Sequence, residues 1–428
     1  MGIPDGRALK AKADNFIKNE LIVSARLSRA VQDLKNGLIN FELKKSKAKT
    51  FFPIDSLDYL TQFNDSTDLR LQFIKFGPND STYIALARGL IKMSDSMVID
   101  RTTFSVPSTK EDTLQAMEQT RLSLVSKGYL SKEASDSTSI AESLKGFQSD
   151  NSLKPDGVIG KNTCKALNES TYNKMERVAL SMDKIRARKP YPKKYIRINI
   201  PEYKLRYFEN DSIRSEHNIV VGKFENQTPE LESRLRRLVV YPFWNVPYSI
   251  SSREILPSVK RDVGYLAKHN YKVYKGKTEI DPTTVNWRKY NAKSFPFKVI
   301  QQPGPSNSLG IIKFDFRNEH SVYFHDTPAK GLFGTHVRAY SHGCMRTQFP
   351  VELGRKVMQY DSIPYRRNDL LADSLDSLLT VGQNYEIKLI DPIPIYIVYE
   401  SVVRDREEMV IHIDIYGRDE EYLKIMNQ

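Results

Sequence analysis

The sequence predicts a multidomain α+β protein, because helical and strand patterns occupy different parts of the chain. Apolar residues before residue 190 mostly recur at helical spacing, whereas many of those after it alternate with a period of two. The change follows Pro190-Tyr191-Pro192. At 428 residues, the chain is long enough for two to four domains of about 150 residues each.

Residues 8–110 are predicted to form a helical scaffold domain without recognisable chemistry. Apolar residues between Val23 and Leu38 fall on one face of a helix. Further helices are indicated at residues 57–60, 69–73 and 82–91. This part of the chain is therefore expected to be structural.

Residues 111–172 contain two amphipathic segments separated by a turn at Pro155 and Asp156-Gly157. Phe147-Gln148, followed by Asp156-Gly157-x-Ile159-Gly160, resembles the small three-helix peptidoglycan-binding module. The alternatives are a plain helical hairpin and a module that is kept only as a spacer. Residues 173–194 are expected to form a helical linker that returns to the scaffold.

Residues 195–425 are predicted to form a β-sandwich or a partly closed barrel, because short strand patterns alternate with Gly, Pro and Asn turns. The runs with period two lie at residues 195–200, 205–208, 217–222, 311–316, 385–389, 395–399 and 409–413.

Residues 249–297 interrupt these strands and carry no strand pattern of their own. Residues 250–263 look helical, and several lysines accompany Tyr265, Trp287 and Tyr290, a mixture suited to holding a peptide that bears carboxylates. An insertion of about 50 residues before the following strands is a candidate lid. A folded insertion without a moving part is the alternative.

The strongest functional signal is Ser341-His342-Gly343-Cys344-Met345-Arg346, with His325 upstream. The chain has only 2 cysteines, and several of its 7 histidines crowd into residues 320–342. The thiolate is the reactive form of cysteine, and a nearby imidazole commonly takes its proton. Residues 321–325 alternate like a strand that ends in a break, so His325 is expected at a strand end, where the following loop could bring Cys344 to it.

These residues carry a resemblance to a known family. The pattern resembles the signature of the L,D-transpeptidases with a YkuD-type catalytic domain. It consists of His325, a spacer of fifteen residues and Ser341-His342-Gly343-Cys344, and Met345-Arg346 fits the end of the signature. The surrounding sequence is similar to the large multidomain YcbB-like branch. The similar stretches are Trp244-Asn245-Val246-Pro247, Pro303-Gly304-Pro305-Ser306-Asn307, Leu309-Gly310, His325-Asp326-Thr327-Pro328 and Ile415-Tyr416-Gly417-Arg418-Asp419.

The resemblance implies a β-sandwich catalytic domain with a capping subdomain inserted at residues 249–297. It also implies a cysteine acyltransferase that forms 3→3 crosslinks in peptidoglycan. Cys344 would attack the carbonyl that precedes D-Ala in a tetrapeptide donor stem and form a thioester, while His325 would take the thiol proton and return it. The backbone carbonyl of Asp326 would orient His325, and N–H groups at Gly343 and Cys344 would stabilise the oxyanion.

The same resemblance implies the remaining site residues and the biological setting. Arg346 would hold a substrate carboxylate or brace the loop, because its planar fork matches paired oxygens. Peptidoglycan stem peptides are the expected partners, carbapenems the expected inhibitors, and the periplasm or cell envelope the expected location, with a role in cell-wall biogenesis and cell shape. No cofactor and no metal is expected. His342 and Ser341 complete the expected catalytic set, and the expected substrate-binding residues are Arg346, Tyr323, Tyr340 and Trp244.

Other interpretations of these residues stay open. Cys344 could be an inert buried thiol, as is expected for Cys164. A zinc site could use His325, His336, His342 and Cys344, although a spacing of two suits chelation poorly and no His-Glu-x-x-His helix exists. A hydrolase with the same Cys-His pair, acting as an L,D-carboxypeptidase or releasing wall proteins, is the main functional alternative. A wall-binding protein with an inert catalytic domain is the third.

The composition sets further limits. The net charge of +13 is spread along the chain, and no zinc-finger, helix-turn-helix or RNA-recognition signature accompanies it, so nucleic acid is not an expected partner. No apolar run approaches the ~20 residues of a membrane span. No signal-peptide pattern begins the sequence, so a leader is expected to have been removed. The sequence does not indicate an oligomeric state.

Overall fold

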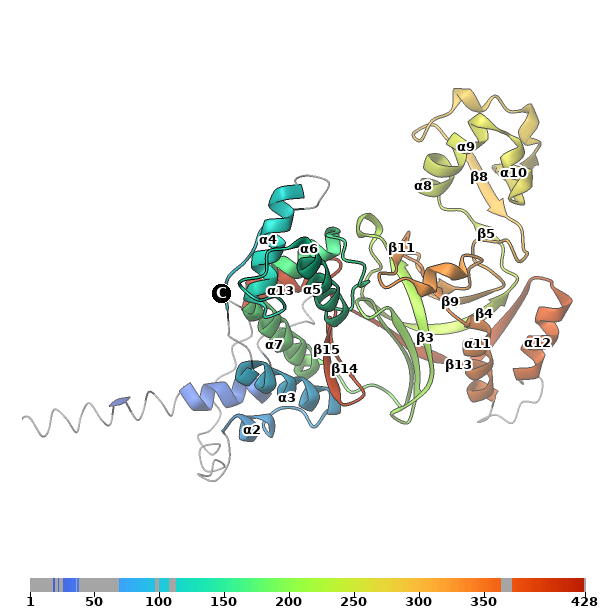
Figure 1. Ribbon diagram of the computed structural model, residues 1–428. Helices are drawn as coiled ribbons and strands as arrows, with labels where there is room; N and C mark the ends of the chain where they lie inside the picture. Colours follow the sequence, from blue (N-terminus) through green and yellow to red (C-terminus); the bar gives the residue numbers. More distant parts are fainter. Residues whose placement is uncertain are drawn as a thin grey trace, which may run out of the picture. The chain divides into compact units, whose positions relative to one another are not determined.

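The computed structural model describes residues 18–19, 22, 26–35, 37, 69–96, 100–107, 113–362 and 372–426. The chain divides into two compact units. Figure 1 shows their helices and strands, coloured by position in the sequence. The first unit contains residues 1–190 and 400–428, and the second contains residues 191–399.

The first unit is mainly helical. Residues 26–35 are helical and bury Val31, as the apolar face predicts, whereas the helix predicted at residues 57–60 lies outside the described residues. Its other elements are α2 (Leu69–Ile74), α3 (Ser81–Ser96), α4 (Thr113–Ser126), α5 (Ser137–Asp150), α6 (Lys161–Asn168), α7 (Thr171–Ala187), the antiparallel strands β14 (Val402–Asp405) and β15 (Glu408–Ile411), and α13 (Arg418–Met426).

The end of the chain belongs to this first unit. Val402 of β14 is buried in one core with Tyr83 of α3 and Val178 of α7. The buried Arg177 of α7 forms an ion pair with Asp419 of α13 at 3.2 Å. The second compact unit ends at residue 399, whereas the predicted catalytic domain extends to residue 425. The strands at 402–411 have the expected period, but the pattern does not reveal which core their apolar side chains join.

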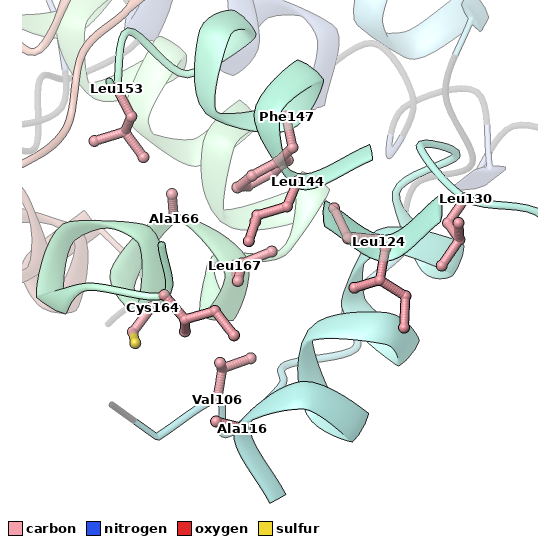
Figure 2. Packing of buried hydrophobic residues seen from close by; sticks show 12 residues of the cluster. Val106, Ala116, Leu124, Leu130, Leu144, Phe147, Leu153, Cys164, Ala166 and Leu167 are labelled. Carbon is pink, nitrogen blue, oxygen red and sulfur yellow. The ribbon is translucent and has the colours of Figure 1, made fainter. Parts of the chain in front are cut away.

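Helices α4, α5 and α6 share a hydrophobic core (Figure 2). Leu124 comes from α4, Phe147 from α5 and Leu167 from α6, and all three are fully buried. Cys164 lies in the same core with 8% of its surface exposed, which confirms that it is a small buried residue.

The hydrogen bonds of Gln148 show why this residue and the turn at Asp156-Gly157 occur together in the three-helix region. Its side chain is buried, and its amide nitrogen donates to the carbonyl of Val158 at 3.0 Å and to Thr163 Oγ1 at 3.2 Å. Its amide oxygen accepts from the N–H of Gly157 at 2.8 Å. One side chain thus connects α5, the turn and α6.

The second unit contains a nine-stranded sheet in the order β11-β3-β12-β10-β9-β4-β13-β1-β2. Its strands are β1 (Lys194–Asn199), β2 (Lys204–Glu209), β3 (Ser212–Gly222), β4 (Leu231–Val240), β9 (Ile312–Phe316), β10 (Phe324–His325), β11 (Ala339–Ser341), β12 (Met345–Thr347) and β13 (Tyr385–Val398). Helices α11 (Pro350–Ser362) and α12 (Ala372–Val381) and the 3-10 turns η2 (Phe224–Asn226) and η6 (Lys330–Gly334) accompany it.

The sheet closes on itself, which refines the predicted β-sandwich. An additional pairing joins β2 to β3, so the strands form a ring and not two separate layers. The long β3 makes this possible, because residues 212–218 pair with β2 and residues 219–220 pair with β12. Gly354 lets α11 approach Leu238 and Ile312 closely on the core side of the sheet.

Strand β13 also differs from the prediction. The runs at residues 385–389 and 395–399 belong to a single strand, and its pairing with β4 shifts in register between Lys388 and Ile393. The extra residues interrupt the alternation, so the sequence pattern alone resembles two strands.

The insertion is folded and contains strands, contrary to the expectation that it has none. Its four-stranded sheet has the order β5-β8-β6-β7. Val273 is the one buried residue of β6, and lysines flank the turn at Gly276, so the alternation is too weak to predict a hairpin. Together with its flanking strands β5 (Trp244–Asn245) and β8 (Phe297–Gln301), the insertion contains α8 (Tyr248–Ile250), the π-helix η3 (Ser251–Ile255), α9 (Leu256–Arg261), α10 (Gly264–Lys268), β6 (Tyr271–Lys275), β7 (Thr278–Ile280), η4 (Pro282–Thr284) and η5 (Trp287–Lys289).

The aromatic residues of the insertion mostly build its own core. Trp287 is 6% exposed, and its Nε1 donates to the carbonyl of Pro282 at 2.8 Å. Tyr265 and Tyr290 pack against the same core. The helices predicted at residues 250–263 are present as η3 and α9. Trp287 is therefore a core residue of the insertion and not a side chain that grips a peptide.

Replacing Gln148 by Ala should lower the free energy of unfolding of the three-helix region by about 1–3 kcal/mol, because Gly157 N–H loses its buried acceptor. Hydrogen exchange of the amides in α5 and α6 measures this region separately from the rest of the chain. The exposed neighbour Ser149, replaced by Ala, is the control and should change protection by less than about 0.5 kcal/mol. Equal protection in both variants would contradict the assigned role of Gln148.

Candidate active site

The pairing of two short strands brings the predicted site residues together. Strands β10 and β12 are parallel, with Phe324 opposite Met345 and His325 opposite Arg346. Phe324 and Met345 are fully buried in the core. Side chains alternate along a strand, so His325 and Arg346 lie on the opposite face of the sheet. Cys344 precedes β12 directly, and its thiol contacts Tyr323, whose ring packs against that of His325.

His325 is held in one orientation. Its ring is 5% exposed, and its Nδ1 is hydrogen-bonded to the backbone carbonyl of Asp326, the contact that the resemblance implies. Because Nδ1 donates to a carbonyl, Nε2 is the nitrogen left to accept a proton. The pKa of His325 is lowered to about 4, mainly by burial and in smaller part by the charge of Arg346, while the hydrogen bond to the Asp326 carbonyl opposes the change. His325 is therefore neutral at pH 7.

Asp326 positions the loop around His325 through its own side chain. Its Oδ2 accepts from the N–H of Ile311 at 3.0 Å, and its Oδ1 pairs with Lys330. Gly310 has a φ of +61°, and a Cβ there would lie 2.2 Å from Asp326 Oδ2. Glycine is therefore required at position 310 both by the backbone conformation and by the close approach of the carboxylate.

Cys344 is half-buried, and its thiol contacts Tyr323. Burial raises the pKa of the thiol, while hydrogen bonds from the backbone and hydroxyl of Tyr323 and the charges of Lys313 and Arg346 oppose this. Among the described contacts, no hydrogen bond joins Cys344 to His325. The structure thus links the two residues through Tyr323, whose ring centre lies 5.6 Å from that of His325, and both side chains are neutral.

The turn before Cys344 is fixed by its neighbours. Ser341 Oγ donates to the carbonyl of Cys344 at 2.5 Å and accepts from the N–H of Gly343 at 3.1 Å. The carbonyl of Gly343 accepts from Thr228 Oγ1 at 2.8 Å, and Gly343 has a φ of +111° that favours glycine. The N–H of Cys344 has no partner among the described residues. Of the two expected oxyanion donors, only this one is unoccupied.

The insertion contacts this site at two places. His342 Nε2 lies 2.7 Å from Oε1 of Glu254, which belongs to η3. Trp244 of β5 is hydrogen-bonded to the side chain of Tyr323. The loop and the tyrosine beside Cys344 therefore both touch elements of the insertion.

The expected substrate-binding residues do not all gather here. Arg346, Tyr323 and Trp244 lie at the site, whereas Tyr340 is 47% exposed on β11 and has no hydrogen bond to Cys344 among the described residues. His336 is exposed, and within the described part of the chain no three His, Cys, Asp or Glu residues are placed to hold a metal ion.

Sequence analysis missed three residues of the site: Lys313, Thr228 and Glu254. Lys313 lies opposite His325 on β9, and its Nζ is 4.2 Å from the centre of the Tyr323 ring. All three reach the site through contacts between segments distant in sequence. The only sequence feature that pointed to Lys313 was its place as a polar residue among the alternating residues of the strand predicted at 311–316.

The rate of alkylation of Cys344 by iodoacetamide should rise with pH around a midpoint above that of the same thiol in unfolded protein, because burial raises its pKa. Replacing Tyr323 by Phe removes a hydrogen bond to the thiolate and should shift the midpoint higher. Peptide mapping by mass spectrometry distinguishes Cys344 from Cys164. A midpoint below that of the unfolded chain would instead indicate a preformed thiolate–imidazolium pair.

Comparisons with known proteins match part of the chain to one family. The family model for YkuD, the L,D-transpeptidase catalytic domain, matches residues 193–363. A Haemophilus influenzae protein with a provisional assignment as an L,D-transpeptidase is 31% identical over 224 residues, which cover 52% of this chain and 44% of that protein. The chain thus matches less than half the length of this relative.

Two solved structures are similar at low identity. An L,D-transpeptidase from Stackebrandtia nassauensis is 12% identical, with 71% of this chain and 97% of that chain covered and a TM-score of 0.21. An L,D-transpeptidase from Enterococcus faecium is 10% identical, with 54% and 65% covered and a TM-score of 0.20. These TM-scores are too low to carry an argument. The comparison that bears on the family is therefore the match of residues 193–363 to the model of the YkuD L,D-transpeptidase catalytic domain, which spans less than half of the chain.

Proposed function

We propose that the protein is a cysteine L,D-transpeptidase that forms 3→3 crosslinks between peptidoglycan stem peptides. One observation carries this proposal: Cys344 lies directly before β12, beside the strand that carries a neutral, oriented His325, and Tyr323 contacts both residues within the stretch that matches the transpeptidase family model. A nucleophile beside a base that is itself oriented by a third group is the arrangement that acyl transfer requires.

In the first half of the reaction, Cys344 Sγ attacks the carbonyl that precedes D-Ala in a tetrapeptide donor. The thiol proton passes to Nε2 of His325 as the S–C bond forms. His325 then returns this proton to the departing nitrogen, the C–N bond breaks, and D-Ala leaves. The low pKa of His325 keeps the imidazole neutral before the attack, so its Nε2 is free to accept the thiol proton.

The oxyanion of the tetrahedral intermediate needs donors beside Cys344. The unoccupied N–H of Cys344 supports a role as the first donor. The N–H of Gly343 would join it only by leaving Ser341 Oγ, so we propose that substrate binding shifts this turn. Arg346, opposite His325, carries the charge that would hold a carboxylate of the donor stem.

In the second half, an amine of another stem peptide attacks the thioester and restores the thiol. Water in place of the amine would give L,D-carboxypeptidase activity. A substrate of this kind places the protein in the cell envelope, and no helix among the described residues is long and apolar enough to cross a membrane. We propose that the insertion acts as a cap that limits the entry of water.

Replacing Cys344 by Ala should abolish both crosslinked product and D-Ala release from purified disaccharide-tetrapeptide, with a rate at least ~10³-fold lower. Replacing His325 by Gln should reduce the rate by about 10²–10⁴-fold, because only the base is lost. Mass spectrometry of the muropeptides measures both. Replacing the buried Cys164 by Ala is the matched control and should leave the products unchanged. Unaltered crosslinking in the Cys344 variant would remove the nucleophile assignment.

Replacing Glu254 by Ala should favour hydrolysis over crosslinking, because the cap loses its contact with His342. The ratio of the two products, at one donor and one acceptor concentration, is the measurement. Acylation by a carbapenem should change less, since a small ligand needs fewer contacts with the cap. Glu279, replaced by Ala, is the control, because its partner Lys272 lies in the same insertion. An unchanged product ratio would count against the cap.

A further inference from the structure

A basic groove crosses the outer face of the sheet and includes Tyr323, the residue that contacts Cys344. We define it by Tyr323 and by five cationic residues of its lining. Its volume is about 920 Å³, and it extends over β9, β4 and β13. The cationic residues are Arg236, Arg237, Lys313, Arg317 and Lys388.

Irregular pairing of two strands creates this groove. The register between β4 and β9 shifts between Leu235 and Arg237, so Arg236 is an extra residue in β4. In a regular strand, Arg236 and Arg237 would point to opposite faces, but both line the groove. The register of β13 shifts after Lys388 on the other side of β4. Such bulges redirect side chains and occur often beside active sites.

The groove carries more positive charge than its acidic residues balance. Asp315 pairs with Arg237 at 2.6 Å and with Lys313 at 3.1 Å, and is the one acidic residue of the lining. Arg236 and Lys388 are exposed, and neither has an acidic partner within the described part of the chain. A concave surface with this charge attracts an anionic ligand.

Tyr323 connects the groove with the reactive thiol. It lines the groove and is also hydrogen-bonded to Cys344. Lys313 contacts the face of the same tyrosine ring. A ligand in the groove would therefore reach Cys344 along β9, whereas the contacts of the insertion reach the site through Trp244 and His342.

We propose that the groove binds the acceptor, a carboxylate-bearing stem peptide whose amine resolves the thioester. This inference rests on the proposed transpeptidase function and assigns the cap side to the donor. Positive surroundings lower the pKa of an amine, so the groove would favour the uncharged, nucleophilic form of the acceptor. Its nitrogen attacks the thioester carbonyl, an amide C–N bond forms, the C–S bond breaks, and the amine proton returns to the sulfur through His325.

The test combines a charge-reversed groove with an altered acceptor. Arg236→Glu together with Lys388→Glu should raise the KM for a soluble tripeptide acceptor containing meso-diaminopimelate by on the order of 10-fold at low salt. The effect should shrink at high salt, where charges are screened beyond a few Å. In the wild type, amidation of the acceptor carboxylates should raise the KM similarly, and in the double variant it should add little, because the two changes remove one interaction.

Two measurements keep the inference separate from the proposed function. Thioester formation from the donor alone should stay within about twofold of wild type in the double variant. The matched control, Lys193→Glu with Arg214→Glu, carries the same charge change on exposed residues that do not line the groove and should leave the acceptor KM unchanged. No thioester in the wild type would overturn the proposed function itself. A normal thioester with an unaltered acceptor KM, or a raised KM for the donor instead, would overturn the acceptor site.

Discussion

The register between β10 and β12 is the constraint on which the site depends. Phe324 and Met345 are directly opposite each other and fully buried, so their core packing fixes which face the neighbouring residues occupy. A slip of one residue would move His325 to the other face and break the pairing that places it near Cys344. The chemistry is therefore anchored by two apolar residues that take no part in it.

Burial then determines the protonation states at this face. It lowers the pKa of His325 and raises that of Cys344, so both are neutral before substrate arrives. The thiolate and the imidazolium therefore form only when a carbonyl is present to be attacked. The Asp326 carbonyl then stabilises the imidazolium, and the Tyr323 hydroxyl stabilises the thiolate. A thiol that remains protonated is also less open to oxidation than a free thiolate.

Much of this arrangement could be predicted from local sequence. The period-two runs located most strands of the second unit, and the break after His325 placed that residue at a strand end. Local patterns could not predict which segments distant in sequence contact each other. The closure of β2 onto β3, the assignment of β14 and β15 to the first unit, and the contact between Glu254 and His342 all depend on it. Trp287 was misjudged for the same reason, because an aromatic residue among lysines has no local mark of burial.

The most direct test of the account is the mass of the protein shortly after it is mixed with a tetrapeptide donor and no acceptor. Transfer of the acyl group to Cys344 should add the mass of the donor less D-Ala, and peptide mapping should locate the adduct on Cys344. Addition of an amine acceptor should then remove it and yield crosslinked product. Release of D-Ala without any adduct, or an adduct on another residue, would contradict the thioester mechanism.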